Sequence, residues 1–303
     1  MAVRVSDSVS IIIATRNRSK ILERCLAALP AGVRNLDPPE VIVVDDCSSD
    51  PTPQVVREFA QATGWRVLCT TQPRPLGANA ARNEGLKIAT GAIIVFIDDD
   101  VFVTESWLDK LLGGLSNGTS VVAGPVRLTL EGPLVGKHRE EVSGYFAEVL
   151  TAPRGLDGEV VPILGNMAAF RGAFEQTAFR DFVRPPVEEI DWMRRAGVHA
   201  GFVPEALVWH YKMPEDVQLK RLLKVAWSRG SEGGWWVREY ATVDSRQVWS
   251  MVARSLSTAV RSFGHAFAQR CWGGVVVGVG ELSKALALGG LINRGPRVPE
   301  SWR

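Results

Sequence analysis

Short apolar runs alternate with longer amphipathic segments along the first ninety residues of the chain. The runs lie at 9–14, 40–45 and 66–69. They are rich in Val and Ile and are apolar at consecutive positions, which predicts strands buried on both faces by covering helices. A helix is predicted after each run, at 19–29, 52–62 and 79–89. This alternation predicts an α/β fold with a mainly parallel sheet.

A fourth apolar run ends in three consecutive aspartates, with residues 92–100 reading AIIVFIDDD. It predicts another buried strand, whose C-terminal end opens onto the crevice where open α/β sheets bind ligands. In an extended backbone Asp98 and Asp100 point to one side and Asp99 to the other, so the first and third can share one Mg²⁺ or Mn²⁺ ion. The alternative is a solvated turn in which Asp100 caps the next helix.

Polar residues also follow the other predicted strands, with 15–18 after the first and 45–50 after the second. The carboxyl ends of parallel strands meet at one edge of a sheet, so these groups are expected to converge. Small residues at 76–83, together with Arg82, suit a helix start that binds phosphate. An ordinary small-residue helix packed on the sheet is the alternative for that segment. A nucleotide site explains all of these features together.

Seven motifs in register resemble family 2 of the glycosyltransferases, which have the GT-A fold. In chain order they are VSIIIATRNR, VIVVDDCSSD, GANAARNEGLKIATG, VFIDDD, GNMAAFR, EEIDWMRRAG and VPEALVWH. The resemblance covers roughly residues 8–212 and implies a GT-A catalytic domain over residues 1–212, Rossmann-like with helices on both faces of the sheet. It implies inverting, metal-dependent transfer of a sugar from a UDP-, dTDP- or GDP-sugar to a hydroxyl group. The acceptor would be a glycan or lipid-linked molecule of cell-surface polysaccharide or glycoconjugate synthesis.

The resemblance also implies roles for individual residues. Asp46 would accept a hydrogen bond from the nucleotide base, and Arg82 would approach the diphosphate. Asp98 would lie near the ribose and the metal, Asp100 would bind the metal directly, and His210 would add a further metal or phosphate contact. For His210, a hydrogen-bonded structural role is the alternative. The expected donor contacts are Thr15, Arg16, Asn17, Asp46, Gly77, Arg82, Asn83, Asp98, Asp99 and Asn166, and the expected metal ligands are Asp98, Asp100 and His210.

Acidic residues at 188–191 are the candidates for the acceptor side of the reaction. Inverting sugar transfer needs a carboxylate that takes the proton from the attacking hydroxyl group. Glu189 is the candidate base, because it matches the second acid of the family's Glu-Asp pair, although it is longer by one methylene group. Glu188 and Asp191 are the alternatives. A further alternative is that all three acids only favour the start of a helix.

From about residue 213 the pattern becomes helical, in three segments, and predicts a separate extension over residues 213–303. Residues 212–303 contain 14 basic and 7 acidic residues, a net charge of +7, while the rest of the chain carries −5. Six of the ten Trp residues also lie there. Basic, Trp-rich helices predict docking on an anionic membrane surface. The alternative is a helical subdomain packed on the catalytic core or on a second subunit in a homodimer.

Composition narrows the remaining function classes. Four cysteines without paired spacing, and no signal peptide, predict a cytoplasmic protein that is at most peripheral on the inner face of the membrane. A nucleotidyltransferase would carry a Gly-rich loop with a Lys after the first strand, and residues 15–18 read TRNR instead. A non-catalytic sugar-nucleotide-binding or scaffold protein is the other alternative. Nucleic-acid binding would leave the acids at the end of the fourth strand unexplained.

Overall fold

The structure is a computed structural model that describes twelve stretches of the chain. They are residues 8–34, 36–116, 118–130, 149–153, 158–175, 177–181, 183, 187–213, 216, 218–240, 245–269 and 272–289. The described residues fall into two compact units. We call them the sheet unit, which lies within residues 8–129, 149–181 and 188–211, and the helical unit, which consists mainly of residues from 212 onward. The predicted boundary between catalytic domain and extension at 212/213 stays a prediction.

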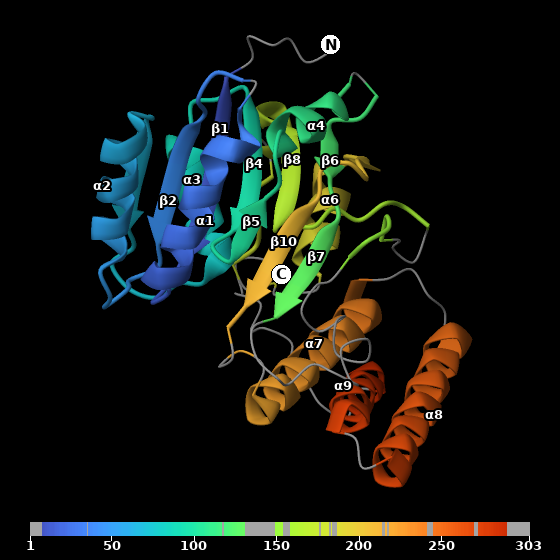
Figure 1. The fold of residues 1–303 in the computed structure, drawn as a ribbon. Helices are drawn as coiled ribbons and strands as arrows, with labels where there is room; N and C mark the ends of the chain where they lie inside the picture. The colour runs from blue at the N-terminus through green and yellow to red at the C-terminus, as the bar shows by residue number, and fades with distance from the viewer. Residues whose placement is uncertain are drawn as a thin grey trace. The chain divides into compact units, whose positions relative to one another are not determined.

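A seven-stranded sheet forms the centre of the sheet unit, in the order β3-β2-β1-β4-β8-β6-β9 (Figure 1). The strands are β1 (Val9–Thr15), β2 (Glu40–Asp45), β3 (Val67–Thr71), β4 (Ile93–Asp98), β6 (Val121–Ala123), β8 (Asn166–Phe170) and β9 (Ala200–Phe202). The first four along the chain are parallel, as predicted, and so are β6 and β9. Strand β8 runs antiparallel to both of its neighbours. The sequence pattern did not predict β6, β8 or β9, because these strands are only three to five residues long.

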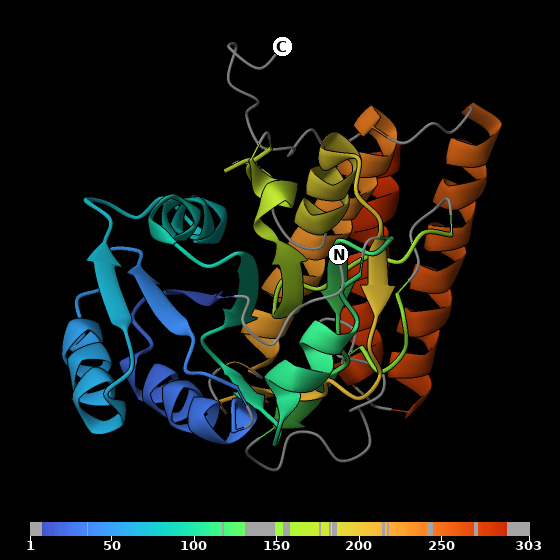
Figure 2. The ribbon, with the colours of Figure 1, turned by 90° about the horizontal axis from the view of Figure 1, so that it is seen from above.

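Helices cover both faces of this sheet, which confirms the predicted α/β arrangement. They are α1 (Ser19–Gly32), α2 (Thr52–Thr63), α3 (Ala78–Ile88), α4 (Trp107–Gly113) and α6 (Glu188–Ala196), and a 3₁₀ helix spans Arg171–Phe174. Alternate residues of β1 enter different cores: Ile11 and Ile13 join the core that includes α1, whereas Ile12 joins the core that includes α3. Figure 2 shows α1 and α3 on opposite sides of β1 and β2. Side chains alternate along a strand, so an unbroken apolar run supplies both cores.

A second, three-stranded sheet has the order β5-β10-β7 and was not predicted from the sequence. Its strands are β5 (Val101–Val103), β10 (Val208–Lys212) and β7 (Val126–Leu130). Strand β5 begins two residues after the turn at Asp99, and β10 pairs with it in antiparallel register, so that His210 lies opposite Val101. This pairing brings a residue from the end of the sheet unit next to the three aspartates.

The helical unit contains α7 (Leu219–Tyr240), α8 (Ser245–Gln269) and α9 (Trp272–Leu288). They confirm the predicted helical extension. Helix α7 packs closely on α9, since a Cβ atom on Gly230 would lie 2.1 Å from the carbonyl oxygen of Gly280. The Ser283 hydroxyl group also donates a hydrogen bond to the carbonyl of Trp227 at 2.7 Å. Among the described residues, no helix has the length and apolarity that crossing a bilayer requires.

Candidate active site

The three aspartates after the apolar run of β4 lie where the sheet opens at its carboxyl edge. Asp98 ends β4, and Asp99 and Asp100 form a turn before β5. The prediction that all three continue an extended strand was therefore wrong, because the chain turns here to enter the second sheet. Asp100 does not cap a helix, since a strand follows it. Its carbonyl oxygen accepts a hydrogen bond from the backbone N–H of Tyr211 at 2.8 Å.

Asp98, Asp100 and His210 nevertheless form one cluster. Each offers a ligand atom, and these atoms lie within 4.8 Å of one another. His210 Nε2 lies 3.0 Å from Asp100 Oδ1, and both side chains are buried. Two carboxylate oxygens and an imidazole nitrogen suit Mn²⁺, and the carboxylates also suit Mg²⁺. The donor set therefore fits the metal that the sequence predicted.

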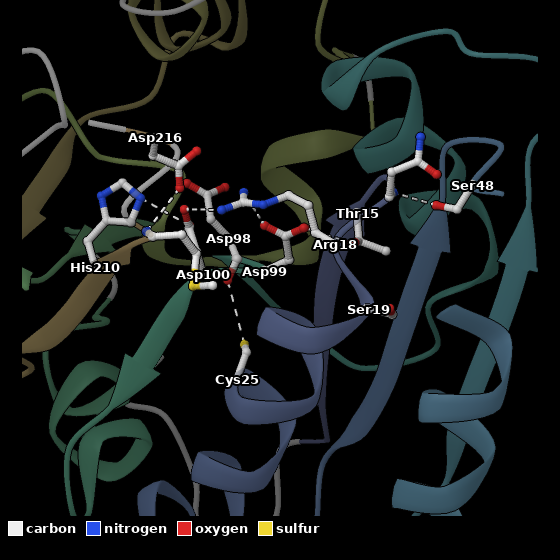
Figure 3. Close-up of polar contacts among 12 residues, drawn as sticks. Thr15, Arg18, Ser19, Cys25, Ser48, Asp98, Asp99, Asp100, His210 and Asp216 are labelled. Atoms are coloured by element: carbon white, nitrogen blue, oxygen red, sulfur yellow. Dashed lines mark hydrogen bonds and ion pairs between the residues drawn. The ribbon is translucent and has the colours of Figure 1, made fainter. Parts of the chain in front are cut away.

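Arg18 is a member of this cluster that the sequence analysis missed. Its guanidinium group contacts Asp99 Oδ1 and Asp100 Oδ2, both at 2.7 Å (Figure 3). The Thr15 hydroxyl group donates to the other oxygen of Asp99 at 2.7 Å. Thr15 ends β1 and Arg18 follows it, and both belong to the polar segment that was predicted to line the site. The signal for Arg18 was present in that segment, but its partners became visible only with the fold.

Negative charge exceeds positive charge at this point of the molecule. Burial raises the pKa of Asp99 to about 7, against the influence of Arg18, and Asp100 and Asp98 add to the increase. Arg82 brings a second guanidinium group: its Nη2 lies 3.0 Å from Asp98 Oδ1, and its Nη1 donates to Asn79 Oδ1 at 2.9 Å. Three neighbouring carboxylates thus face two arginines. A divalent cation would offset the repulsion between the carboxylates.

The loop before α3 is attached to the end of β2 through Asp46. Its two carboxylate oxygens accept hydrogen bonds from the backbone N–H groups of Leu76 and Gly77, at 2.6 and 3.0 Å. Gly77 has φ 98°, a conformation that side chains disfavour, which explains the glycine at this position. Asp46 was predicted to contact the nucleotide base, and Gly77 was predicted to contact a phosphate. Both groups already form hydrogen bonds within the protein. Each carboxylate oxygen keeps a second lone pair for a ligand.

The loop after β1 is held against the loop after β2. Asn17, at φ 53°, accepts hydrogen bonds through Oδ1 from the backbone N–H and the hydroxyl group of Ser49, and its own N–H donates to the Ser48 hydroxyl at 2.8 Å. Arg16 is exposed beside it. The structure thus places Thr15, Arg16 and Asn17 at the same edge as Asp46.

Asn83 and Asn166, two predicted donor contacts, have hydrogen-bond partners within the protein. Asn83 binds the backbone N–H and carbonyl of Phe179, at 3.0 and 2.7 Å. Asn166 is fully buried. Its amide group donates to the carbonyls of Pro125 and Ala206, and its carbonyl accepts from the indole N–H of Trp107. The Asn166 side chain joins β8 to neighbouring segments, and its contact with a donor stays a prediction.

Gly165, just before β8, is the residue of the GNMAAFR motif that approaches the cluster. A Cβ atom there would lie 2.9 Å from Asp98 Oδ2. Any side chain at this position would therefore have to displace the Asp98 carboxylate. The glycine lets the backbone pass directly beside the predicted metal ligand.

The three candidate bases at the start of α6 have different surroundings. Burial raises the pKa of Glu189, and the charge of Asp98 adds to this increase. Two influences oppose the increase: the charge of Arg82, and a hydrogen bond that the backbone N–H of Leu164 donates to Glu189 at 3.3 Å. The charges of Asp98 and Arg82 thus act on Glu189. Asp191 instead forms ion pairs with Arg180 and Arg195, at 3.2 and 2.8 Å. Glu188 is buried.

A cavity of about 310 Å³ lies along another side of α6. Its lining includes apolar side chains from Val161, Ile190, Met193 and Val198, and its polar members are Glu159, Arg194 and His199. Val161 is only three residues from Leu164, which contacts Glu189. Three extended residues span at most about 10 Å, so the cavity lies near the candidate base.

The sequence matches the family model described as "Glycosyl transferase family 2" over residues 10–177, more than half of the chain. The chain belongs to this family. Family 2 membership agrees with the motifs that the sequence analysis identified, and the matched region contains β1 to β4 and the aspartate cluster.

Curated proteins with similar sequences are glycosyltransferases. Glycosyltransferase AglE of Haloferax volcanii is 32% identical over 123 residues, which are 40% of this chain and 40% of that protein. The GalNAc(5)-diNAcBac-PP-undecaprenol beta-1,3-glucosyltransferase of Campylobacter jejuni is 30% identical over 165 residues, 54% of this chain and 49% of that protein. The chain thus spans less than half the length of these relatives.

A mannosyltransferase from Pyrobaculum calidifontis, solved in complex with GDP-Man and Mn²⁺, has a similar structure. The TM-score is 0.62 at 17% sequence identity, and the match covers 93% of this chain and 87% of that one. At this identity the likeness shows the fold. The chain has the GT-A fold of glycosyltransferases, as predicted.

Proposed function

We propose that this protein is a metal-dependent, inverting glycosyltransferase that uses a nucleotide-sugar donor. One observation carries the proposal: the cluster of Asp98, Asp100 and His210 lies within electrostatic reach of Glu189, a carboxylate whose pKa burial raises. A metal site for a diphosphate and a base for an acceptor hydroxyl group are the two parts that such a transfer needs.

Asp98, Asp100 and His210 would hold the metal ion. When bound, a divalent cation there would offset the charge of the donor diphosphate and favour its departure. Arg82 would bind a diphosphate oxygen, since its guanidinium group is already held by Asn79 beside Asp98. The mannosyltransferase of similar fold carries GDP-Man and Mn²⁺, which supports a nucleotide sugar and Mn²⁺ here.

Glu189 would take the proton from the attacking hydroxyl group. A carboxylate with a raised pKa is a stronger base than an ordinary glutamate, and Asp191 is engaged by two arginines. A single displacement by the acceptor oxygen needs no protein nucleophile, and it inverts the configuration at the sugar carbon. Water would have to be excluded during this step to limit hydrolysis.

The acceptor is proposed to be a glycan or a lipid-linked saccharide. The Campylobacter jejuni relative is named for an undecaprenol-linked saccharide, which supports the second class. The cavity beside α6 is a place for part of such a molecule, because its apolar lining lies near Glu189. A lipid-linked acceptor also agrees with peripheral binding of the basic helical unit to an anionic membrane.

Thermal stabilisation by UDP-, GDP- and dTDP-sugars, each with Mn²⁺, with Mg²⁺ and with chelator, tests the donor site. We expect one nucleotide to raise the unfolding temperature, and to do so only with metal, because a ligand of the folded state stabilises it. Asp100→Ala should remove this metal-dependent increase. No stabilisation by any donor would contradict the proposal.

Glu189→Gln tests the base. The variant should keep the donor-dependent stabilisation and lose sugar transfer by about 10²- to 10⁴-fold. Glu58→Gln, on the exposed side of α2, is the matched control and should transfer normally. NMR of the product should show the opposite anomeric configuration to the donor; retention would rule out the single displacement. Donor binding without turnover on any acceptor would favour a sugar-nucleotide-binding scaffold.

A further inference from the structure

Helix α8 presents an exposed apolar stripe along one side. Its members are Trp249, Leu256, Val260, Phe263 and Phe267, with exposed fractions of 64, 40, 71, 36 and 90%. They are separated by seven, four, three and four residues, so they lie on one face of the helix. Large apolar side chains in a continuous exposed row mark an interaction surface.

Arginines accompany this stripe. Arg246, Arg254 and Arg261 are exposed, and α8 contains no Asp or Glu over its 25 residues. Within the described part of the chain, no ion pair joins these three arginines to a carboxylate. Their spacing of eight and seven residues places them together on the helix surface, next to the stripe rather than within it. The helix therefore offers cationic and apolar groups side by side.

The rest of the apolar side of α8 is used within the helical unit. Val252, Ala259 and Ala266 are buried. Helix α9 approaches this side closely, because a Cβ atom on Gly274 would lie 3.0 Å from the Cβ atom of Ala266. Packing against α9, which lies beside α8 in Figure 1, thus fixes the rotation of α8. The aromatic and arginine side chains on the other part of its surface stay exposed.

We propose that α8 is the membrane-contacting element of this protein and lies in the headgroup region of an anionic bilayer. Trp249, Val260 and Phe267 enter the boundary with the acyl chains, while the arginines bind lipid phosphates. A helix with a strongly apolar face, basic flanking residues and no acids has the features of an interfacial helix. This contact rests on the membrane association proposed for the helical unit and is independent of the sugar-transfer chemistry.

Charge argues against a second copy of the chain as the occupant of this surface. A symmetric contact between two α8 helices would bring two sets of arginines together, with no carboxylate on either helix to pair with them. Anionic lipid supplies the missing negative charge. A lipid surface can also take up the aromatic side chains along the whole length of the 25-residue helix.

Vesicle co-sedimentation of the full chain tests the proposal, with phosphatidylcholine vesicles and with equal parts of phosphatidylcholine and phosphatidylglycerol. The wild-type protein should bind the anionic vesicles more tightly. The double variant Trp249→Ser/Phe267→Ser should lose about tenfold or more in affinity, because two exposed rings no longer enter the bilayer. Arg254→Gln/Arg261→Gln should lose about tenfold on anionic vesicles and little on neutral ones.

Matched controls are Leu150→Ser, an exposed apolar residue of the sheet unit, and Arg57→Gln, an exposed arginine on α2. Both should bind vesicles as the wild type does. Equal binding by the ring variant, or a wild-type dimer in sedimentation velocity that this variant dissociates, would overturn the proposal. Stabilisation by a nucleotide-sugar donor should be unchanged in every variant. If the wild type shows no such stabilisation, the proposed sugar transfer is rejected. The proposal for α8 is then still tested by the vesicle binding.

Discussion

The two carboxylate oxygens of Asp100 contact two different basic side chains. Arg18 lies at Oδ2 and His210 at Oδ1, and Arg18 also reaches Asp99. The arginine therefore offsets repulsion between two adjacent buried carboxylates. A residue in this position supports both the fold and the proposed metal site.

Replacing Arg18 with Gln should destabilise the folded chain by about 3 kcal/mol, because removal of one partner leaves buried charge uncompensated. The loss should be smaller with Mn²⁺ than with chelator, since the metal would supply the missing positive charge. Chemical denaturation in both conditions measures this difference. Arg16→Gln, at an exposed neighbouring position, is the control and should change stability little. An equal loss with and without Mn²⁺ would argue against a metal beside Asp100.

The surroundings of Glu189 predict the pH dependence of transfer. Burial raises the pKa of this carboxyl group, with Asp98 adding to the increase and Leu164 N–H and Arg82 opposing it. The basic form therefore accumulates only as pH rises through the raised pKa, so the acidic limb of kcat/KM should lie above the ordinary pKa of Glu. Stability should change with pH in the opposite direction to activity. The stabilisation linked to the raised pKa of Glu189 is fully present below the pKa of this group in the unfolded chain, and it is lost as pH rises through the folded-state pKa. A limb that persists in Glu189→Gln would assign the titration to another group.

At the scale of the element, one side chain joins the starts of two helices. Asp50 accepts hydrogen bonds from the backbone N–H of Ser19, at the start of α1, and from the N–H and hydroxyl groups of Thr52, at the start of α2. Burial raises the pKa of Asp50, but the hydrogen bonds from Thr52 and Ser19 outweigh it and lower the pKa overall. The stabilisation is therefore present at neutral pH and is lost as pH falls through the lowered pKa.

Asp50→Ala should lower the free energy of unfolding by about 1–2 kcal/mol at pH 7, the usual cost of losing a helix cap. Urea denaturation at pH 7 measures the change, and the difference from wild type should shrink toward pH 3. Asp37→Ala, at an exposed loop position, should be neutral. A neutral result for Asp50→Ala would mean that water replaces both caps without cost.

Helix α3 lies against β1 through a glycine. A Cβ atom on Gly85 would lie 2.5 Å from Cγ2 of Ile12. Gly85→Ala should therefore cost about 1–3 kcal/mol despite the better helix propensity of Ala. Gly113→Ala in α4, where the added atom meets nothing within 4 Å, is the matched control and should be neutral or slightly stabilising. If both variants behave alike in urea denaturation, α3 does not pack on β1 at this distance.

At the scale of the whole molecule, the cluster of Asp98, Asp100 and His210 joins two sheets. Asp98 belongs to β4 of the seven-stranded sheet, while His210 belongs to β10 of the three-stranded one. The two residues are far apart in the sequence and meet because β10 pairs with β5, directly after the aspartates. A metal ion bound there would link the two sheets.

His210→Ala should weaken Mn²⁺ binding by about tenfold or more and reduce the stabilisation that Mn²⁺ gives without nucleotide. Isothermal calorimetry and thermal unfolding with Mn²⁺ and with chelator measure both effects. His199→Ala, an exposed histidine outside the cluster, is the control. Unchanged Mn²⁺ affinity in His210→Ala would leave this residue with the structural role, as the hydrogen-bonded partner of Asp100.

The central elements of the fold were predicted from sequence, whereas the strands after residue 100 were not. Strands β1, β2 and β4 are unbroken Val- and Ile-rich runs that supply two cores at once, and this pattern is readable without a structure. The later strands β6, β8 and β9 have only three to five residues. Such short runs carry little periodicity, and they are defined by pairing with residues distant in the chain.

The sequence by itself determined the parallel sheet, the aspartates at its edge, the family resemblance and the basic helical extension, because each depends on residues close together in the chain. The tertiary structure decided which polar groups meet. It placed Arg18 between Asp99 and Asp100, brought Glu189 under the influence of Asp98 and Arg82, and buried Asn166 among backbone carbonyls. It also left the Trp249–Phe267 side of α8 exposed. These outcomes depend on strand pairing and helix packing between distant segments, which local periodicity does not encode.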